Sequence, residues 1–183
     1  MRQALKLHPD SRSPASAIAA SVERPRPGLL ALRYAVTGAL DGIVLPAATA
    51  ATREDELWRH TCFEAFIAEP GGAGYFEFNV SPSTQWAAYR FDGYRQGIAP
   101  AQGVPPPSIT LRRTGDGFDL AVALDLSGVE ALAGPGAWRL GLSAVIEAAE
   151  GGVSYWALAH PAGKADFHHA DGFAMQLPPT ERP

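Results

Sequence analysis

Short runs of alternating apolar and polar residues, separated by glycine and proline, constrain the fold of this chain more than any other feature. In LLALRYAVTG, Leu30, Leu32, Tyr34 and Val36 alternate with smaller or polar residues. This period of two is typical of a strand with one buried face. GFDLAVALDL repeats the pattern, and the preceding Gly-Asp-Gly predicts a hairpin that joins it to SITLRRT.

Further strand candidates follow along the chain: AIAASVER, CFEAFIAE, YFEFNV, WAAYRF, WRLGLSAVIEA, GVSYWALA and GFAMQL. Only SGVEALAG predicts a helix, because Ser127 and Glu130 have capping-box spacing. The proline-rich GIAPAQGVPPPS cannot be a central strand and is predicted to be a surface connection. Many short strands with one short helix at most predict an all-β fold.

The predicted architecture is an antiparallel, jelly-roll-like β-sandwich, with a closed barrel as the alternative. A length of 183 residues, 46% of them hydrophobic, suits a single domain over residues 1–183, with its core within about 28–178. Seven apolar residues are expected in the buried interior: Phe76, Phe78, Val80, Phe118, Leu120, Val122 and Leu140.

The net charge and the cysteine content exclude several kinds of partner and of covalent cross-link. A net charge of −4 provides no basic field for nucleic acid or for an anionic membrane surface, so we expect neither as a partner. Cys62 is the only cysteine, which excludes an internal disulfide and favours a buried thiol. No signal-like or membrane-spanning apolar run is evident, so a cytoplasmic location is expected. The oligomeric state stays open.

Polar residues stand inside two runs that otherwise predict buried strands. Strand alternation places Glu77 and Asn79 beside Tyr75 on one face, and Glu64 beside Phe66 on one face. Each residue alone fits a solvated outer face equally well. Together, rings, carboxylates and an amide in a concavity are what a neutral polar ligand such as a sugar requires. We therefore interpret this face as a candidate binding site for a small molecule.

Four sequence motifs carry a family resemblance. They are Trp58, Glu64, Phe66 and Ile67 in the order W-x5-E-x-F-I, then NVSP, then a late tryptophan strand, and finally DFHHADGF. Over roughly residues 28–178 the chain resembles the DOMON-like domains related to family 9 carbohydrate-binding modules. That family is a β-sandwich that binds sugars in some branches and haem in others.

The resemblance implies positions for a sugar site. An aromatic clamp would fall on Trp58 and Phe167, and polar partners on Glu64 and Asn79, with Glu77 and His168 as further polar contacts of this ligand-binding set. Two positions depart from the sugar binders, which have tryptophan where this chain has Phe167 and a carboxylate where it has Thr61. The identity of the ligand stays open.

The histidine-rich tail offers metal or haem as alternatives. His160, His168 and His169 have the side chains that bind zinc, but adjacent histidines on an extended segment point to opposite sides. A haem iron would need an axial ligand, for which His60, His168, His169 or Met175 are candidates. The alternative for Asp166 and Asp171 is a loop in which they satisfy backbone groups. No cofactor is expected.

An enzyme is a further alternative. Glu64 and Glu77 on successive strands are candidates for the carboxyl pair of a glycosidase. No nucleophile elbow, phosphate loop, dinucleotide fingerprint or metalloprotease helix accompanies them. Catalysis therefore ranks below binding, and an exposed aromatic patch would instead favour a protein-interaction module. The sequence predicts a non-catalytic domain that binds a small ligand, with a carbohydrate or sugar derivative as the first choice.

Overall fold

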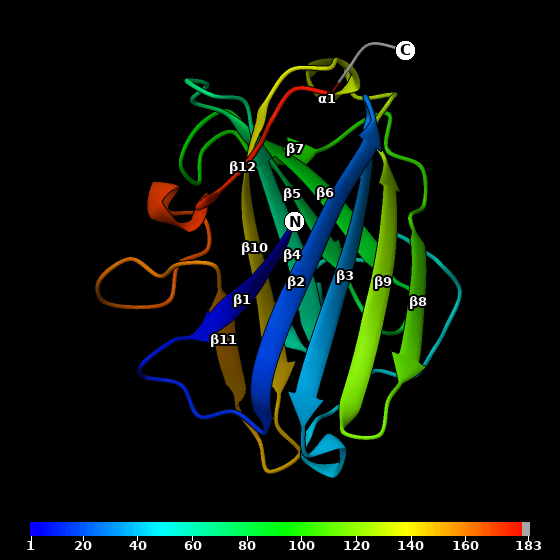
Figure 1. Ribbon diagram of the computed structural model, residues 1–183, viewed down its shortest axis with the longest axis vertical. Helices are drawn as coiled ribbons and strands as arrows, with labels where there is room; N and C mark the ends of the chain where they lie inside the picture. The colour runs from blue at the N-terminus through cyan, green and yellow to red at the C-terminus, as the bar shows by residue number, and fades with distance from the viewer. Residues whose placement is uncertain (181–183) are drawn as a thin grey trace.

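The computed structural model describes residues 1–180 and consists almost entirely of β-strands (Figure 1). The strands are β1 Arg2–Leu7, β2 Ala15–Arg26, β3 Leu29–Gly38, β4 Cys62–Ala68, β5 Tyr75–Val80, β6 Trp86–Phe91, β7 Ala99–Pro100, β8 Ser108–Arg113, β9 Gly117–Asp125, β10 Trp138–Glu147, β11 Val153–Ala157 and β12 Met175–Leu177. The helical segments are the 3-10 turns η1 Leu40–Gly42, η2 Leu57–Arg59 and η3 Ala170–Gly172, and the helix α1 Glu130–Ala133.

All strands pair antiparallel, in the order β7-β6-β5-β4-β10-β11-β1-β2-β3-β9-β8, and β12 pairs with β10. The sheet folds over into two layers, with β2, β3, β9 and β8 in front of β4, β5 and β6 (Figure 1). The all-β, antiparallel prediction is confirmed. The two predicted sheets, however, are continuous through β1, which pairs with both β11 and β2.

The strand β1 was absent from the sequence prediction for a physical reason. Only Leu5 among its six residues is buried, and the run RQALKL has just two large apolar residues, Leu5 and Leu7, which are too few to establish a period. Its backbone supplies the hydrogen bonds that join the two layers, and backbone pairing leaves no signature in the side chains.

The main core lies between the two layers and contains six of the seven predicted interior residues. Phe78 and Val80 of β5 face Phe118, Leu120 and Val122 of β9, and Leu140 of β10 also belongs to this core. The seventh, Phe76, is half-buried and packs against the core edge. The period-two pattern therefore identified the inward faces of these strands correctly.

The predicted capping box of the helix is wrong. The side chain of Ser127 donates to the carboxylate of Asp125 at 2.6 Å, and the residue before α1 is Val129, which provides no side-chain cap. The predicted proline-rich connection includes the two-residue strand β7, which lies at one end of the strand order. An edge position tolerates Pro100, because its missing N–H needs no partner there.

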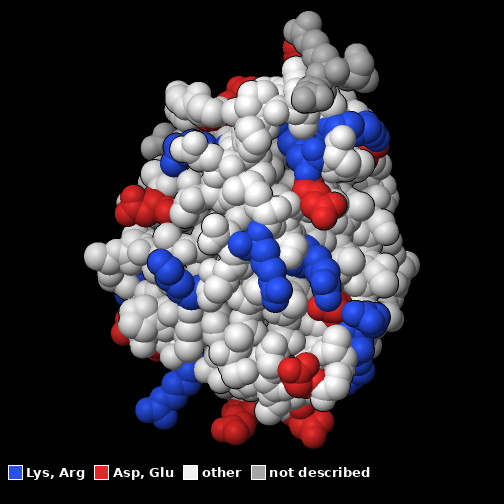
Figure 2. Space-filling model, in the orientation of Figure 1, with Lys and Arg blue, Asp and Glu red and all other residues white. Residues whose placement is uncertain are grey.

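Charged side chains of both signs are scattered over the face shown in Figure 2, with uncharged surface between them. On β3, β8 and β9, Arg33 and Arg112 both pair with Asp119, at 2.7 and 2.9 Å. Within residues 1–180, no helix combines the length and the apolar character that crossing a membrane requires.

Candidate ligand-binding cleft

The layer that contains β4, β5 and β6 has a second face, turned away from the main core. Alternation along β4 sends Phe63 inward and Glu64 outward, and along β5 it sends Phe78 inward and Glu77 outward. The outward face carries its own small apolar cluster, which includes Phe66. The sequence assignment of the two faces is therefore confirmed for these strands.

A cleft of about 890 Å³ opens on this outer face. Five of the six predicted ligand-binding residues line it: Trp58, Glu64, Glu77, Phe167 and His168. The sixth, Asn79, is not among the lining residues: it is 1% exposed, and its side chain donates a hydrogen bond to Glu77. The structure thus brings together residues that are more than a hundred positions apart in the sequence. Their roles in binding stay predictions.

Buried carboxyl groups form the floor of the cleft. Glu64 is 3% exposed, and its Oε2 accepts a hydrogen bond from Ser143 at 3.1 Å. Glu77 is 6% exposed, and its Oε1 accepts from Nδ2 of Asn79 at 2.7 Å. In strand register Glu64 lies opposite Asn79, so Glu64 and Glu77 are diagonal neighbours on one face.

Burial raises the pKa of both carboxyl groups, and the pKa of Glu64 rises above neutrality. Burial, together with the neighbouring carboxyl of Glu77, raises the pKa of Glu64 from 4.5 to about 8. Burial also raises the pKa of Glu77, against the opposing effects of the Asn79 hydrogen bond and the charge of Arg95. At neutral pH Glu64 therefore carries a proton and can donate as well as accept hydrogen bonds.

Trp58 projects into the cleft from η2. Leu57, next to it, is buried against Cys62 and Ala87, and this anchor fixes the turn on the sheet. The turn begins at Glu56, whose φ of 60° is in the left-handed region. Trp58 is left 48% exposed, so its indole ring is available to a ligand.

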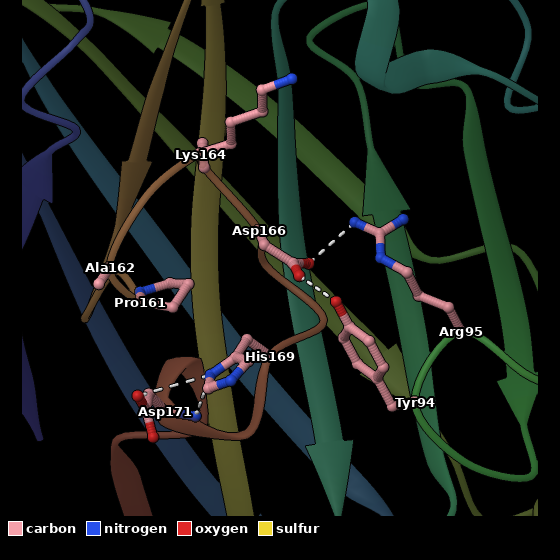
Figure 3. A pocket seen from close by; sticks show the side chains of 9 residues that line it. Tyr94, Arg95, Pro161, Ala162, Lys164, Asp166, His169 and Asp171 are labelled. Carbon is pink, nitrogen blue, oxygen red and sulfur yellow. Dashed lines mark hydrogen bonds and ion pairs between the residues drawn. The ribbon is translucent and has the colours of Figure 1, made fainter.

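The segment that follows β11 also lines the cleft. Phe167 packs its ring against that of Tyr155, with 5.9 Å between centroids. Asp166 anchors this segment, because its carboxylate accepts hydrogen bonds from the side chains of Tyr94 and Arg95 and from the backbone N–H of His168 (Figure 3). Tyr94, Arg95 and Asp166 also line an adjacent hollow of about 660 Å³, which Figure 3 shows from close by. The loop therefore holds Phe167 and His168 against the sheet.

His168 sits within a cage of rings. Its centroid lies 5.2 Å from that of Phe66, 5.2 Å from that of Phe91 and 5.8 Å from that of Tyr75. Burial, with the positive charge of Arg95, lowers the pKa of His168 from 6.5 to about 4. The imidazole is consequently neutral at physiological pH.

The residues named for metal or haem do not share one place. His160 bonds the carbonyl of Lys6 at 2.8 Å, and His169 accepts from the backbone N–H of Asp171 at 3.3 Å. Met175 lies in the main core. His60 is exposed and pairs with Glu147 at 2.8 Å. Within residues 1–180, no group of three or more His, Cys, Asp or Glu side chains is arranged to hold a metal ion.

Several cleft residues were missed at the sequence level. Tyr89 could have been found, because alternation in WAAYRF places it on the outer face beside Glu77, its partner in strand register. Arg95 lies in the turn after β6 and carries no periodic signal. Thr61, which replaces the expected carboxylate, has a structural role: its hydroxyl donates to the carbonyl of Val44 at 2.6 Å and accepts from the N–H of Glu147 at 3.1 Å.

Sequence comparison finds no matching protein family and no matching curated protein. Solved structures do share the fold. A candidate carbohydrate-binding protein from Bacteroides uniformis is 12% identical, with a TM-score of 0.65, over 93% of this chain and 83% of that chain. A family 9 carbohydrate-binding module from Caldicellulosiruptor kristjanssonii in complex with cellotriose is 9% identical, with a TM-score of 0.55, over 89% of this chain and 74% of that chain. The module from that organism with glucose is 11% identical, with a TM-score of 0.53, over 95% and 81%. This chain therefore has the fold of family 9 carbohydrate-binding modules.

Proposed function

We propose that the cleft binds a carbohydrate or sugar derivative without catalysing a reaction. The observation that carries this proposal is the composition of one cleft, which is lined by the exposed Trp58, by Phe167 and by buried carboxyl groups. Aromatic rings suit the C–H faces of a sugar ring, and the floor offers hydrogen-bond partners for its hydroxyls. Such recognition needs no cofactor.

In this proposal each residue has a distinct role. Trp58 stacks on the sugar ring, opposite Phe167. Glu77 accepts from hydroxyl groups, and Glu64, which is protonated at neutral pH, both donates and accepts. Asn79 acts from behind by orienting Glu77. Apolar burial supplies affinity, while the buried polar groups set specificity, because leaving one unpaired costs about 1–3 kcal/mol.

The structural neighbours support the same class of ligand. The modules from Caldicellulosiruptor kristjanssonii are in complex with cellotriose and with glucose. The DOMON-like part of the resemblance depends on the sequence motifs, which include Trp58, Glu64 and the segment around Phe167. Glucose and cellotriose are therefore the first ligands to test.

A thermal-shift screen of the purified protein tests the proposal. A ligand that binds only the folded form raises the unfolding temperature by mass action. We expect sugars of the glucose and cellotriose type to raise it, and divalent metals and haem to leave it unchanged. Stabilisation by haem or a metal alone, with none by any sugar, would contradict the proposal and support the histidine-based alternative.

The raised pKa of Glu64 favours a second candidate function, a glycosidase with Glu64 and Glu77 as its carboxyl pair. A raised pKa suits a general acid at neutral pH. Aryl glycosides with a chromogenic leaving group test this candidate. Release of the chromophore that is abolished in both Glu64→Gln and Glu77→Gln would establish catalysis, and absence of release leaves non-catalytic binding as the function.

A further inference from the structure

A chain of hydrogen bonds links Arg95, Tyr75 and His168 at the edge of the cleft. The backbone N–H of Arg95 donates to the phenolic oxygen of Tyr75 at 3.2 Å. The same oxygen lies 2.8 Å from Nδ1 of His168. Within residues 1–180, Nδ1 is the one acceptor in hydrogen-bond contact with the hydroxyl proton of Tyr75. When Tyr75 donates this bond, Nδ1 accepts it.

The direction of this bond determines the tautomer of His168. A neutral imidazole carries a single proton, on one of its two nitrogens. The ring is neutral because burial among Phe66 and Phe91 holds its pKa at about 4. With Tyr75 as the donor to Nδ1, that single proton lies on Nε2.

Nε2 of His168 lies near the carboxyl group of Glu77. Nε2 is 3.8 Å from Oε2 of Glu77, which is too far for a direct hydrogen bond. The other carboxylate oxygen, Oε1, already accepts from Asn79. Both His168 and Glu77 line the cleft, so a donor and a free acceptor flank one position on its surface.

We propose that Tyr75 is a positioning residue that holds His168 in the Nε2–H form, so that His168 and Glu77 together recognise one hydroxyl group of the ligand. The hydroxyl oxygen accepts from Nε2–H, and the hydroxyl proton is donated to Oε2 of Glu77. This inference rests on the proposed carbohydrate function. In the opposite tautomer both protein atoms would be acceptors, and a single hydroxyl proton can serve only one of them.

Nitrogen-15 NMR of the histidine ring tests the first half of the inference and requires no ligand. The parent protein at pH 7 should show His168 with a protonated Nε2 and an unprotonated Nδ1. Tyr75→Phe should increase the population of the Nδ1–H tautomer, because it removes the donor. Tyr155→Phe, the same change at a tyrosine that lines the cleft, should leave the His168 tautomer unchanged. A parent spectrum with Nδ1 protonated would overturn the inference even if Tyr75→Phe fails to fold.

Calorimetric titration with glucose and its five monodeoxy analogues, one for each hydroxyl group, tests the second half. In the parent, removing one particular hydroxyl should weaken binding about tenfold or more, because Nε2–H and Oε2 are then left unpaired. In Tyr75→Phe, discrimination at that position should shrink to about threefold or less, while the other positions keep their ratios. Equal discrimination in parent and variant overturns the inference but not the proposed function. If neither glucose nor any analogue binds, the cleft does not recognise glucose, and the proposed recognition of its hydroxyl group fails.

Discussion

The side-chain amide of Asn79 donates a 2.7 Å hydrogen bond to Oε1 of Glu77, and both side chains are buried beneath the cleft. A hydrogen bond to an ionised carboxylate is stronger than one between neutral groups. It opposes the desolvation that raises the pKa of Glu77. Asn79 therefore helps the protein keep an acceptor in a buried position without contacting the cleft itself.

Asn79→Ala should lower the free energy of unfolding by about 1–3 kcal/mol at pH 9, because it leaves a buried carboxylate unpaired. The loss should be smaller at pH 4, where Glu77 is protonated, since its folded-state pKa lies above the ordinary value. Urea unfolding at both pH values measures the effect. In a Glu77→Gln background the pH dependence of this loss should vanish. An equal loss at both pH values in the parent background would show that the hydrogen bond does not act through the charge of Glu77.

Glu64 should make the protein less stable as pH rises. Its pKa is about 8 in the folded protein against 4.5 ordinarily, so the folded state binds more protons than the unfolded state between these values. The free energy of unfolding therefore falls as pH increases from about 4.5 to 8. His168 acts in the opposite sense between about 4 and 6.5, because its folded-state pKa is depressed.

Comparison of the parent with Glu64→Gln across this pH range isolates the contribution of Glu64, because His168 and the other groups are common to both proteins. The stability of Glu64→Gln relative to the parent should increase steadily toward pH 8. Denaturant unfolding at several pH values measures this difference. Parallel stability curves for the two proteins would mean that Glu64 is ionised in the folded state.

Gly117 should tolerate no side chain. A Cβ at this position would lie 1.8 Å from the backbone oxygen of Val36, where β9 pairs with β3. Gly117→Ala should therefore destabilise the protein by more than about 2 kcal/mol, because the clash is with backbone. Gly115→Ala in the same turn is the matched control, since a Cβ there meets nothing within 4 Å. Equal unfolding midpoints for the two variants would contradict the register of β3 and β9.

The sequence correctly predicts those strands in which the alternation of side chains matches the alternation of buried and exposed positions. In β5 and β9 the alternation is regular, and the inward positions of Phe78 and Leu120 followed from it directly. The same alternation placed Glu64 and Glu77 on the outer face, where the cleft opens. For these residues the local sequence pattern is sufficient to predict which face of the sheet they occupy.

Other features depend on contacts that no local pattern encodes. The strand β1 is held by backbone pairing to two partners, and only Leu5 in it is buried. Arg95 lines the cleft from the turn after β6, where its own backbone has a left-handed φ of 53°. No periodic pattern in the sequence predicts this conformation. Asn79 lies on the predicted face, but its side chain is buried and bonded to Glu77 instead of lining the cleft. Side-chain packing, and not strand period, decides this.

Titration of glucose or cellotriose into the parent and into Trp58→Ala tests the carbohydrate site most directly. Trp58 is 48% exposed, so its truncation should leave the unfolding midpoint nearly unchanged. Binding should weaken at least about tenfold, equivalent to about 1.4 kcal/mol, through loss of the stacking surface. Ile98→Ala, which removes an exposed apolar side chain without a ring from the same cleft, should lose less. A sugar that binds Trp58→Ala as tightly as the parent would contradict the assignment of this cleft as the site.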